Sequence, residues 1–290
     1  MNGGHEIDRI VQRLLGASIN RSQPLAGGCM HEVHRLELSN GSACVIKVAA
    51  GDDGPLLQSE LAGLKALAET GGVRTPDVLG LEREGMCTVL VLEALEPAGN
   101  SPVNWHGFGE SLAALHACEG SGRYGFESDN HIGRTPQCNT WCSDWVEFNV
   151  ASRLGPQVHR ARDNGLLGDT ECSWIESLIN QLDRYIPRHP RSSLLHGDLW
   201  SGNALPMRSG DVAVIDPACS WGDAWSDVGM MELFGGFPRA CLDAWEAEQS
   251  DRDQSEERKA IAQVYHLLNH LNLFGASYLG QLMSVVERLR

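Results

Sequence analysis

The chain has 290 residues and a formal net charge of −15, with 42% hydrophobic and 21% charged residues. This composition is that of a globular protein, and its negative balance disfavours nucleic acids and anionic membrane surfaces as partners. A chain of this length suits two closely joined lobes.

The sequence also favours a cytoplasmic protein. It shows no apolar run of signal-peptide type, and no stretch of about 18 apolar residues that could cross a membrane. Nine cysteines are scattered without a C-x-x-C pair, which is typical of reduced thiols. Cys138 and Cys142 could ligate a metal, but no second pair completes such a site.

Residues 25–50 predict a β-hairpin with a glycine-rich entry. Asn40 and Gly41 favour a two-residue type I′ turn, because both central positions of that turn need positive φ. Ahead of the hairpin, Gly27 and Gly28 would let a turn approach a ligand closely.

The returning strand of this hairpin contains Lys47 in the apolar stretch CVIKVAA. A buried ammonium group needs an anionic partner, and Glu60 is the first candidate. It lies in residues 54–70, where leucines recur at helical spacing. A glycine turn, a strand lysine and a helix glutamate in this order resemble the phosphate-holding apparatus of kinases. A solvated Glu60 on an amphipathic helix is the plain alternative.

The apolar residues 86–95 predict a buried strand that ends before Pro97. Beyond it the apolar periodicity is helical. A stripe of Trp141, Trp145 and Phe148 lies on one side of the second predicted helix, where core packing is the favoured role for Trp145 and Phe148. The helices are predicted at 105–120, 140–167 and 172–186, with one or two more over 258–290.

The stretch LLHGDLWSGNAL at 194–205 has the densest set of polar groups. Its first two leucines predict a short strand, and VAVIDPA at 212–218 predicts another. We therefore expect Asp198, Asn203 and Asp216 to converge at the ends of these strands. One carboxylate can accept a hydroxyl proton, while the carboxamide and the second carboxylate suit Mg²⁺. A plain polar turn would not explain three such groups.

Nearly the whole chain resembles the fructosamine kinase family, which is related to aminoglycoside phosphotransferases and choline kinases. The resemblance implies an α+β, two-lobed protein-kinase-like fold. A small β-rich lobe with one helix would span residues 1–95 and bind the nucleotide, and a larger, mainly helical lobe would span 96–290. The stretches that carry the resemblance are HGDLWSGN at 196–203, DNHIGRTPQCNTWCSDWVEF at 129–148, ELFGGFP at 232–238 and LLNHLNLFG at 267–275.

The reaction implied by the resemblance is phosphorylation by ATP, with Mg²⁺, of the 3-hydroxyl of a ketosamine such as a ribulosamine or fructosamine adduct. The product would release its amine, which amounts to protein deglycation. Asp198 resembles the catalytic base, Asn203 and Asp216 the Mg²⁺ ligands, Lys47 the phosphate-binding lysine and Glu60 its helix partner.

Further roles follow from the same resemblance. The glycine turn of Gly27 and Gly28 would cover the phosphates, and the Glu93 carbonyl and Leu95 N–H would bind adenine. On the substrate side, Trp200 is expected to stack on the sugar and His270 to reach the ketosamine. The catalytic loop would be braced by His196 and pinned by Asp227 from a helix start. The resemblance assigns no task to Asp129, Asn130 and Trp141 of the second motif.

The chain departs from the family pattern after Asp216. Ser220 and Trp221 stand where tyrosines are common, and Trp225 stands where a glutamate could contact the substrate or order the loop. These changes bear on substrate identity more than on phosphoryl transfer. Cys29, in the glycine turn, could link two copies of the chain by a disulfide, so a monomer and a redox-linked homodimer are both open.

Two other functions fit the same residues. The acceptor could be an aminoglycoside, an aminosugar or a choline-like amine, because an acidic protein suits any cationic acceptor. The chain could also be a nucleotide-binding pseudokinase that acts as a scaffold. The intact Asp198, Asn203 and Asp216 count against the scaffold.

Overall fold

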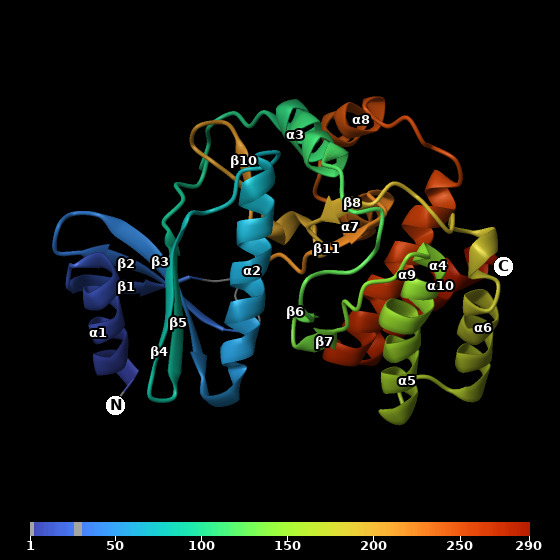
Figure 1. Ribbon diagram of the computed structural model, residues 1–290, viewed down its shortest axis with the longest axis horizontal. Coiled ribbons are helices and arrows are strands. Elements are labelled where there is room, and N and C mark those ends of the chain that lie inside the picture. Colours follow the sequence, from blue (N-terminus) through green and yellow to red (C-terminus); the bar gives the residue numbers. More distant parts are fainter. Residues whose placement is uncertain (1–2, 26–30) are drawn as a thin grey trace.

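The computed structural model describes residues 3–25 and 31–290, which form two lobes side by side (Figure 1). The first lobe is built on a five-stranded antiparallel sheet with the strand order β1-β2-β3-β5-β4. Its strands are β1 (Ile19–Pro24), β2 (Glu32–Leu38), β3 (Ala43–Ala50), β4 (Val78–Glu84) and β5 (Cys87–Glu93). The predicted hairpin and the predicted apolar strand are therefore confirmed.

The turn of the hairpin differs from the predicted type I′ turn. Gly41 takes a positive φ of 83°, whereas Asn40 does not. The Gly41 N–H donates to the Leu38 carbonyl at 3.0 Å, and the Leu38 N–H donates to the Ser42 carbonyl at 2.9 Å. The Asn40 side chain accepts from the Ser42 N–H at 3.0 Å. This side-chain hydrogen bond stabilises a turn in which Asn40 keeps a negative φ, so only Gly41 adopts the left-handed backbone conformation.

Two helices cover the sheet, one more than expected for this lobe. Helix α1 (Gly3–Leu15) packs against Val89 and Val91 of β5, while α2 (Gly54–Thr70) packs against Leu90 and Leu92. Since successive residues of a strand point to opposite faces, the two helices lie on opposite faces of the sheet. The first helix has apolar residues at helical spacing that the sequence analysis did not use, namely Ile7, Ile10, Val11 and Leu14.

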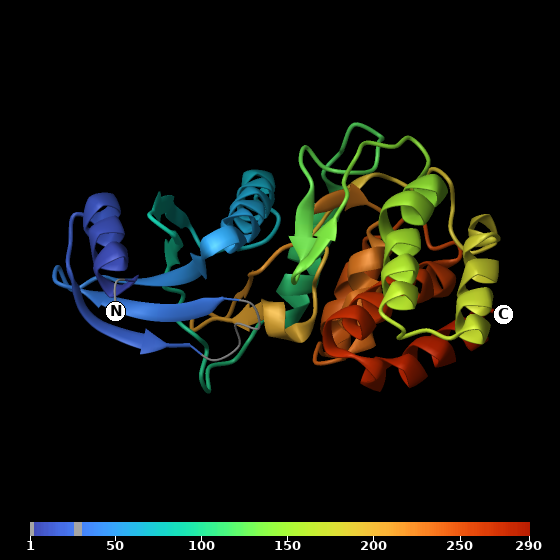
Figure 2. The ribbon, with the colours of Figure 1, turned by 90° about the horizontal axis from the view of Figure 1, so that it is seen from below.

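The second lobe is mainly helical (Figures 1 and 2). Its strands form three two-stranded antiparallel pairs: β6 (Asn130–Ile132) with β7 (Thr135–Gln137), β8 (Ser193–Leu195) with β11 (Ser220–Gly222), and β9 (Ala204–Pro206) with β10 (Val212–Val214). Its helices are α3 (Trp105–Ala117), α4 (Trp145–Asn149), α5 (Gly155–Asp163), α6 (Asp169–Ile179), α7 (Trp225–Leu233), α8 (Arg239–Ala247), α9 (Ser255–Phe274) and α10 (Leu279–Leu289).

The helix predicted over 140–167 is shorter and interrupted. Asp144 caps its start, because its side chain accepts from the Glu147 N–H at 3.0 Å. A π-helical turn over Val150–Leu154 separates α4 from α5. Trp141 precedes the helix, so the prediction that three aromatic residues lie on one side of it was wrong. Trp145 and Phe148 are buried and stacked with their ring centroids 5.4 Å apart, which confirms their core role.

No helix within residues 3–25 and 31–290 combines the length and the apolar character needed to cross a bilayer.

Candidate active site

The predicted lysine–glutamate pair is formed between the sheet and helix α2. Lys47 lies on the face of β3 that meets α2, and its Nζ is 2.6 Å from Oε1 of Glu60. The two side chains are almost fully buried, with exposed fractions of 7% and 9%. Lys47 also pairs with Asp216. Burial alone would lower the pKa of Lys47, but the two carboxylates outweigh it and raise that pKa, so the lysine is charged.

The loop after β8 brings Asn203 onto Asp198. The Asn203 Nδ2 donates to the backbone carbonyl of Asp198 at 2.8 Å and to its Oδ2 at 3.2 Å. Because the nitrogen of the carboxamide is engaged in this way, its oxygen is left for another ligand. Burial and the charge of Asp216 raise the pKa of Asp198 to about 7, although the Asn203 hydrogen bond opposes the rise.

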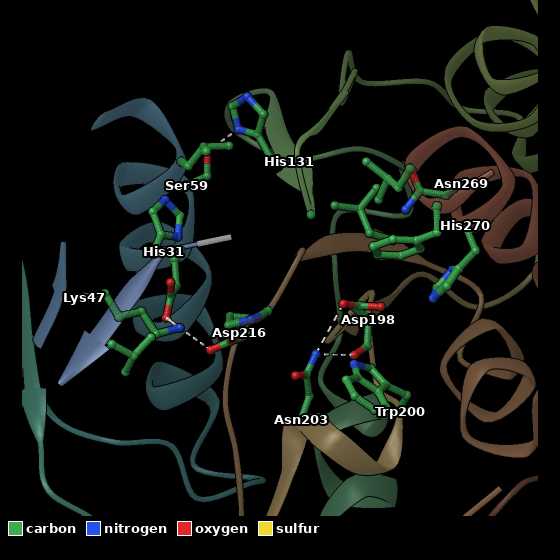
Figure 3. Close-up of a pocket in the computed structure, with 18 residues that line it drawn as sticks. His31, Lys47, Ser59, His131, Asp198, Trp200, Asn203, Asp216, Asn269 and His270 are labelled. Carbon is green, nitrogen blue, oxygen red and sulfur yellow. Dashed lines mark hydrogen bonds and ion pairs between the residues drawn. The ribbon is translucent and has the colours of Figure 1, made fainter. Parts of the chain in front are cut away.

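Asp216 follows β10 with a strained backbone. Its φ is 57°, in the left-handed region that non-glycine residues rarely adopt. Such strain persists where the surroundings impose it, and it is often found at functional sites. The conformation directs the carboxylate toward Lys47 (Figure 3). Asp198, Asn203 and Asp216 line one cavity, so their predicted convergence is confirmed.

Asp227 pins the loop that contains Asp198, as expected. Its carboxylate accepts the His196 N–H at 2.8 Å and the Gly197 N–H at 2.9 Å, and it lies 3.1 Å from Nε2 of His116. Its exposed fraction is 1%. Burial alone would raise the pKa of Asp227, but its hydrogen bonds and the neighbouring imidazoles outweigh this effect and lower the pKa.

The His196 ring supports the same loop from its other side. Its Nε2 lies 2.9 Å from the Ile215 carbonyl, and its Nδ1 accepts from the Asp198 N–H at 3.3 Å. Burial lowers the pKa of this imidazole, so it is neutral and can donate at one nitrogen and accept at the other. The predicted bracing role of His196 is confirmed.

Asp227→Ala is expected to destabilise the protein by about 1–3 kcal/mol for each buried N–H that it leaves without an acceptor. Because the folded pKa of Asp227 is lowered, the carboxylate contributes stability above its unfolded pKa and loses that contribution as the pH falls through the folded pKa. Urea unfolding from pH 7 down to acid should therefore show the stability gap between variant and wild type narrowing. Asp243→Ala, at an exposed carboxylate, is the control. A constant gap would contradict the assignment.

Two cavities meet at the charged residues between the lobes. The first holds about 170 Å³ and is drawn in Figure 3. The second, of about 390 Å³, has apolar walls and reaches Glu93 and Leu95. Lys47, Asn203 and Asp216 line both cavities, whereas Asp198 lines only the first.

Trp200 and His270 both line the first cavity, as expected (Figure 3). The Trp200 ring, which is 37% exposed, lies over Gly202, where a Cβ atom would come within 2.2 Å of the ring. The Nδ1 of His270 lies 2.8 Å from the His266 carbonyl. Burial lowers the pKa of His270, so its imidazole is neutral.

Other residues of this cavity were missed by the sequence analysis. His31, Ser59, His131 and Asn269 contribute to its wall (Figure 3). The Nε2 of His31 is buried and has no hydrogen-bond partner among the described residues. A signal was available, because His131 and Asn269 lie inside the motifs that carry the family resemblance, while His31 stands three residues after Gly28 in the sequence.

Five predicted residues are not among those that line either cavity in the part of the chain that the structure describes. Gly27, Gly28 and Cys29 fall outside the described residues, so the phosphate-covering turn and the disulfide-linked dimer stay predictions. Asp129 accepts the Asn139 N–H at 2.8 Å, and Asn130 donates to the Cys219 carbonyl at 2.7 Å. Both residues therefore hold the chain in place beside the site.

Trp225 does not lie in the cavity that contains Asp198. It is buried against Trp245, with ring centroids 4.8 Å apart, and its Nε1 donates to the Asp251 carbonyl at 3.1 Å. It borders a separate cavity of about 400 Å³. The start of α7 directs the Trp225 side chain into the core, so of the two roles open to a glutamate at this position, substrate contact is not available to this tryptophan. Ser220 and Trp221 belong to β11, paired with β8.

Comparisons with known proteins agree with this geometry. The fructosamine kinase family model matches residues 5–290. The chain is 34% identical over 271 residues to a Synechocystis protein named as a ketoamine kinase, covering 93% of this chain and 90% of that protein. It is 33% identical over 276 residues to the chloroplastic protein-ribulosamine 3-kinase of Arabidopsis thaliana, covering 93% and 82%.

Solved structures show the same fold. A Haemophilus somnus structure described as a fructosamine-3-kinase superposes with a TM-score of 0.89 at 26% identity, covering 99% of this chain and 97% of that chain. The aminoglycoside phosphotransferase APH(4)-Ia superposes with a TM-score of 0.64 at 17% identity, covering 97% and 98%. The second likeness supports the kinase-like fold alone.

Proposed function

Because the chain belongs to the fructosamine kinase family and is a phosphotransferase that acts on a hydroxyl group, we propose that ATP is its phosphoryl donor and the 3-hydroxyl of a ketosamine its acceptor. The observation that carries this proposal is the junction of the two cavities. One has the apolar walls that an adenine ring needs, the other contains Asp198, and they share Lys47, Asn203 and Asp216.

The nucleotide side is assigned as follows. Adenine would occupy the apolar cavity, with the Glu93 carbonyl and the Leu95 N–H at its edge as the proposed hydrogen-bonding groups. The phosphates would then reach the junction, where charged Lys47 can bind their oxygens and Glu60 holds the ammonium group in place. Gly27 and Gly28 are proposed to close over the phosphates.

Asn203 and Asp216 fit a Mg²⁺ site. They offer one carboxamide oxygen and one carboxylate at the junction, and Mg²⁺ is usually bound through few protein oxygens, with phosphates and water completing its shell. Among the described residues, no group of three His, Cys, Asp or Glu side chains forms a separate metal site. When bound, the ion would offset the negative charge of the transferring phosphoryl group.

The acceptor side rests on Asp198 and Trp200. A hydroxyl group that hydrogen-bonds to the Asp198 carboxylate would transfer its proton there as the oxygen attacks phosphorus. The raised pKa of about 7 makes this carboxylate a better base near neutral pH than an ordinary aspartate. Trp200 would stack on the apolar face of the sugar, and His270, which lines the same cavity, would contact the ketosamine.

The acceptor is tested by ADP release over a panel of ribulosamines, fructosamines, aminoglycosides, aminosugars and choline at saturating ATP. Turnover that is highest with a ketosamine supports the proposal. Release of the amine from the phosphorylated sugar adduct supports a role in deglycation. Preference for an aminoglycoside or for choline would overturn the acceptor. Nucleotide binding without turnover of any of these compounds would leave the scaffold alternative.

Trp200→Ala is expected to raise the acceptor KM about 3–10-fold with a smaller change in kcat, because aromatic stacking contributes about 0.5–1.5 kcal/mol. The ATP KM should not change. Trp174→Ala on α6, whose ring lies against Arg290 outside either cavity, is the matched control. An unchanged acceptor KM in the Trp200 variant would remove the stacking role.

We also propose a cytoplasmic location. The eight cysteines in the described part of the chain are free thiols, as is usual in a reducing compartment. Cys29 remains the residue proposed to link two copies under oxidation. Non-reducing gels of the wild type and of Cys29→Ser distinguish a disulfide-linked dimer from a monomer.

A further inference from the structure

The β6–β7 hairpin of the helical lobe touches helix α2 of the sheet lobe. Ser59 Oγ lies 3.1 Å from Nδ1 of His131, which is next to the hairpin tip (Figure 3). Arg134, in the turn of the hairpin, lies 3.4 Å from Asp53 at the start of α2. Figures 1 and 2 both show the hairpin beside this helix. The Arg134–Asp53 pair is largely exposed and contributes little, whereas the Ser59–His131 contact is partly buried.

The base of the hairpin is anchored by buried side-chain amides. Asn130 donates to the Cys219 carbonyl at 2.7 Å, and Gln137 donates to the Ala218 carbonyl at 3.4 Å. The Tyr265 hydroxyl donates to Oε1 of Gln137 at 2.6 Å. These partners belong to the segment just after Asp216 and to helix α9, so buried hydrogen bonds attach the hairpin to the helical lobe.

A buried arginine secures the segment that follows β7. Arg153 donates to the Cys138 carbonyl at 2.7 Å and to Oδ1 of Asn139 at 2.8 Å. Its guanidinium group also lies over the Phe148 ring, 4.4 Å from the centroid. A hairpin held at both ends in this way is a rigid support for whatever its tip contacts.

Helix α2 also lies against the segment that follows Asp216. A Cβ atom at Gly63 would come within 2.9 Å of Cγ of Pro217, so only glycine allows this approach. The Cys219 Sγ lies 3.6 Å from the Gly63 carbonyl. The hairpin tip and this segment thus contact α2 on both sides of Glu60 along the chain.

We propose that the β6–β7 hairpin is a strap that holds α2 against the helical lobe and thereby positions Glu60 for Lys47, with Ser59 and His131 as positioning residues for nucleotide binding. This inference rests on the proposed function, because it assumes that Lys47 binds the nucleotide phosphates. Ser59 immediately precedes Glu60, so a shift of Ser59 moves the glutamate with it. The proposal assigns a task to residues 129–139 of the motif at 129–148, which the catalytic roles leave unexplained.

The strap is tested first by nucleotide affinity. His131→Phe keeps a ring but removes the hydrogen bond, and Ser59→Ala removes its partner. Each variant is expected to raise the Kd for an ATP analogue about 3–10-fold, since one hydrogen bond is worth about 0.5–1.5 kcal/mol. The double variant should be no worse than either single one, and His131→Asn, which retains a polar group, should recover much of the affinity. Unchanged Kd values would overturn the proposal.

Two further measurements separate positioning from direct contact. In a Glu60→Gln background, His131→Phe should have almost no further effect on Kd, because the strap acts through Glu60. An undiminished effect would mean that His131 contacts the ligand itself, and would overturn the positioning role. Amide hydrogen exchange in α2 should be faster in His131→Phe than in wild type, and equal exchange rates would also contradict the strap.

His34→Phe is the matched control. His34 Nδ1 lies 3.1 Å from Ser22 Oγ, the same pair of groups at the same distance, but within the sheet. This variant should leave both the Kd and the exchange of α2 unchanged. Because the Kd is measured without any acceptor, a wrong assignment of the ketosamine does not affect the result. Failure of the wild type to bind an ATP analogue would refute the proposed function and would be recognised as such.

Discussion

Asp198→Asn is expected to lower kcat by about 10²–10⁴-fold, the range that general-base assistance contributes. The carboxamide cannot take the hydroxyl proton, yet it has nearly the same shape and can still meet Asn203, whose Nδ2 is 3.2 Å from the carboxylate. Asp198 lines only the acceptor cavity. The ATP-analogue Kd should therefore stay close to that of the wild type while turnover is lost.

The measurement pairs ADP release with calorimetric binding of the ATP analogue. Asp211→Asn, at an exposed carboxylate in the turn between β9 and β10, is the control and should keep full activity. A kcat near that of the wild type in Asp198→Asn would remove the base assignment. A large loss of nucleotide affinity would instead mean that Asp198 belongs to the nucleotide site.

Asp216→Asn has the second largest expected effect. It removes the one carboxylate of the proposed metal site and one of the two anionic partners of Lys47. Metal-ion charge stabilisation is worth several kcal/mol, so kcat/KM should fall by about 10³-fold. The concentration of Mg²⁺ that gives half-maximal rate should rise at the same time.

A Mg²⁺ titration of the initial rate at fixed ATP measures both changes. Asp251→Asn removes a carboxylate that pairs with a cation elsewhere, with Arg258 at 2.9 Å, and serves as the control. If Asp216→Asn lost activity but kept the wild-type dependence on Mg²⁺, the residue would act only through Lys47. That outcome would contradict its role as a metal ligand.

Local patterns in the chain were enough to predict most of the contacts within the candidate site. Asp198 and Asn203 are five residues apart in one loop, so their contact depends on a short segment alone. Lys47 and Glu60 are separated by one strand and part of one helix, and a buried lysine must find a nearby anion. These predictions succeeded because each depended on short-range geometry or on the cost of burying a charge.

Other predictions from the sequence were wrong or incomplete. Two of them were wrong because a side chain forms a local hydrogen bond that the pattern does not show. The Asn40 side chain binds the Ser42 N–H and so changes the turn type. Asp144 caps a helix that periodicity alone extended to residue 140. Helix α1 was overlooked although its apolar spacing is regular. Nothing in a local pattern shows that the side chain at Trp225 enters the core and not the cavity.

By itself, then, the sequence determined the two-lobed kinase-like class, the family, and the residues that meet at the candidate site. The tertiary structure alone decided which distant groups share a wall or a hydrogen bond. Ser59 and His131 are 72 residues apart, and Asn130 donates to the Cys219 carbonyl, 89 residues away. Such contacts depend on how whole lobes and helices pack, and packing sums many weak, long-range interactions that no short stretch of residues encodes.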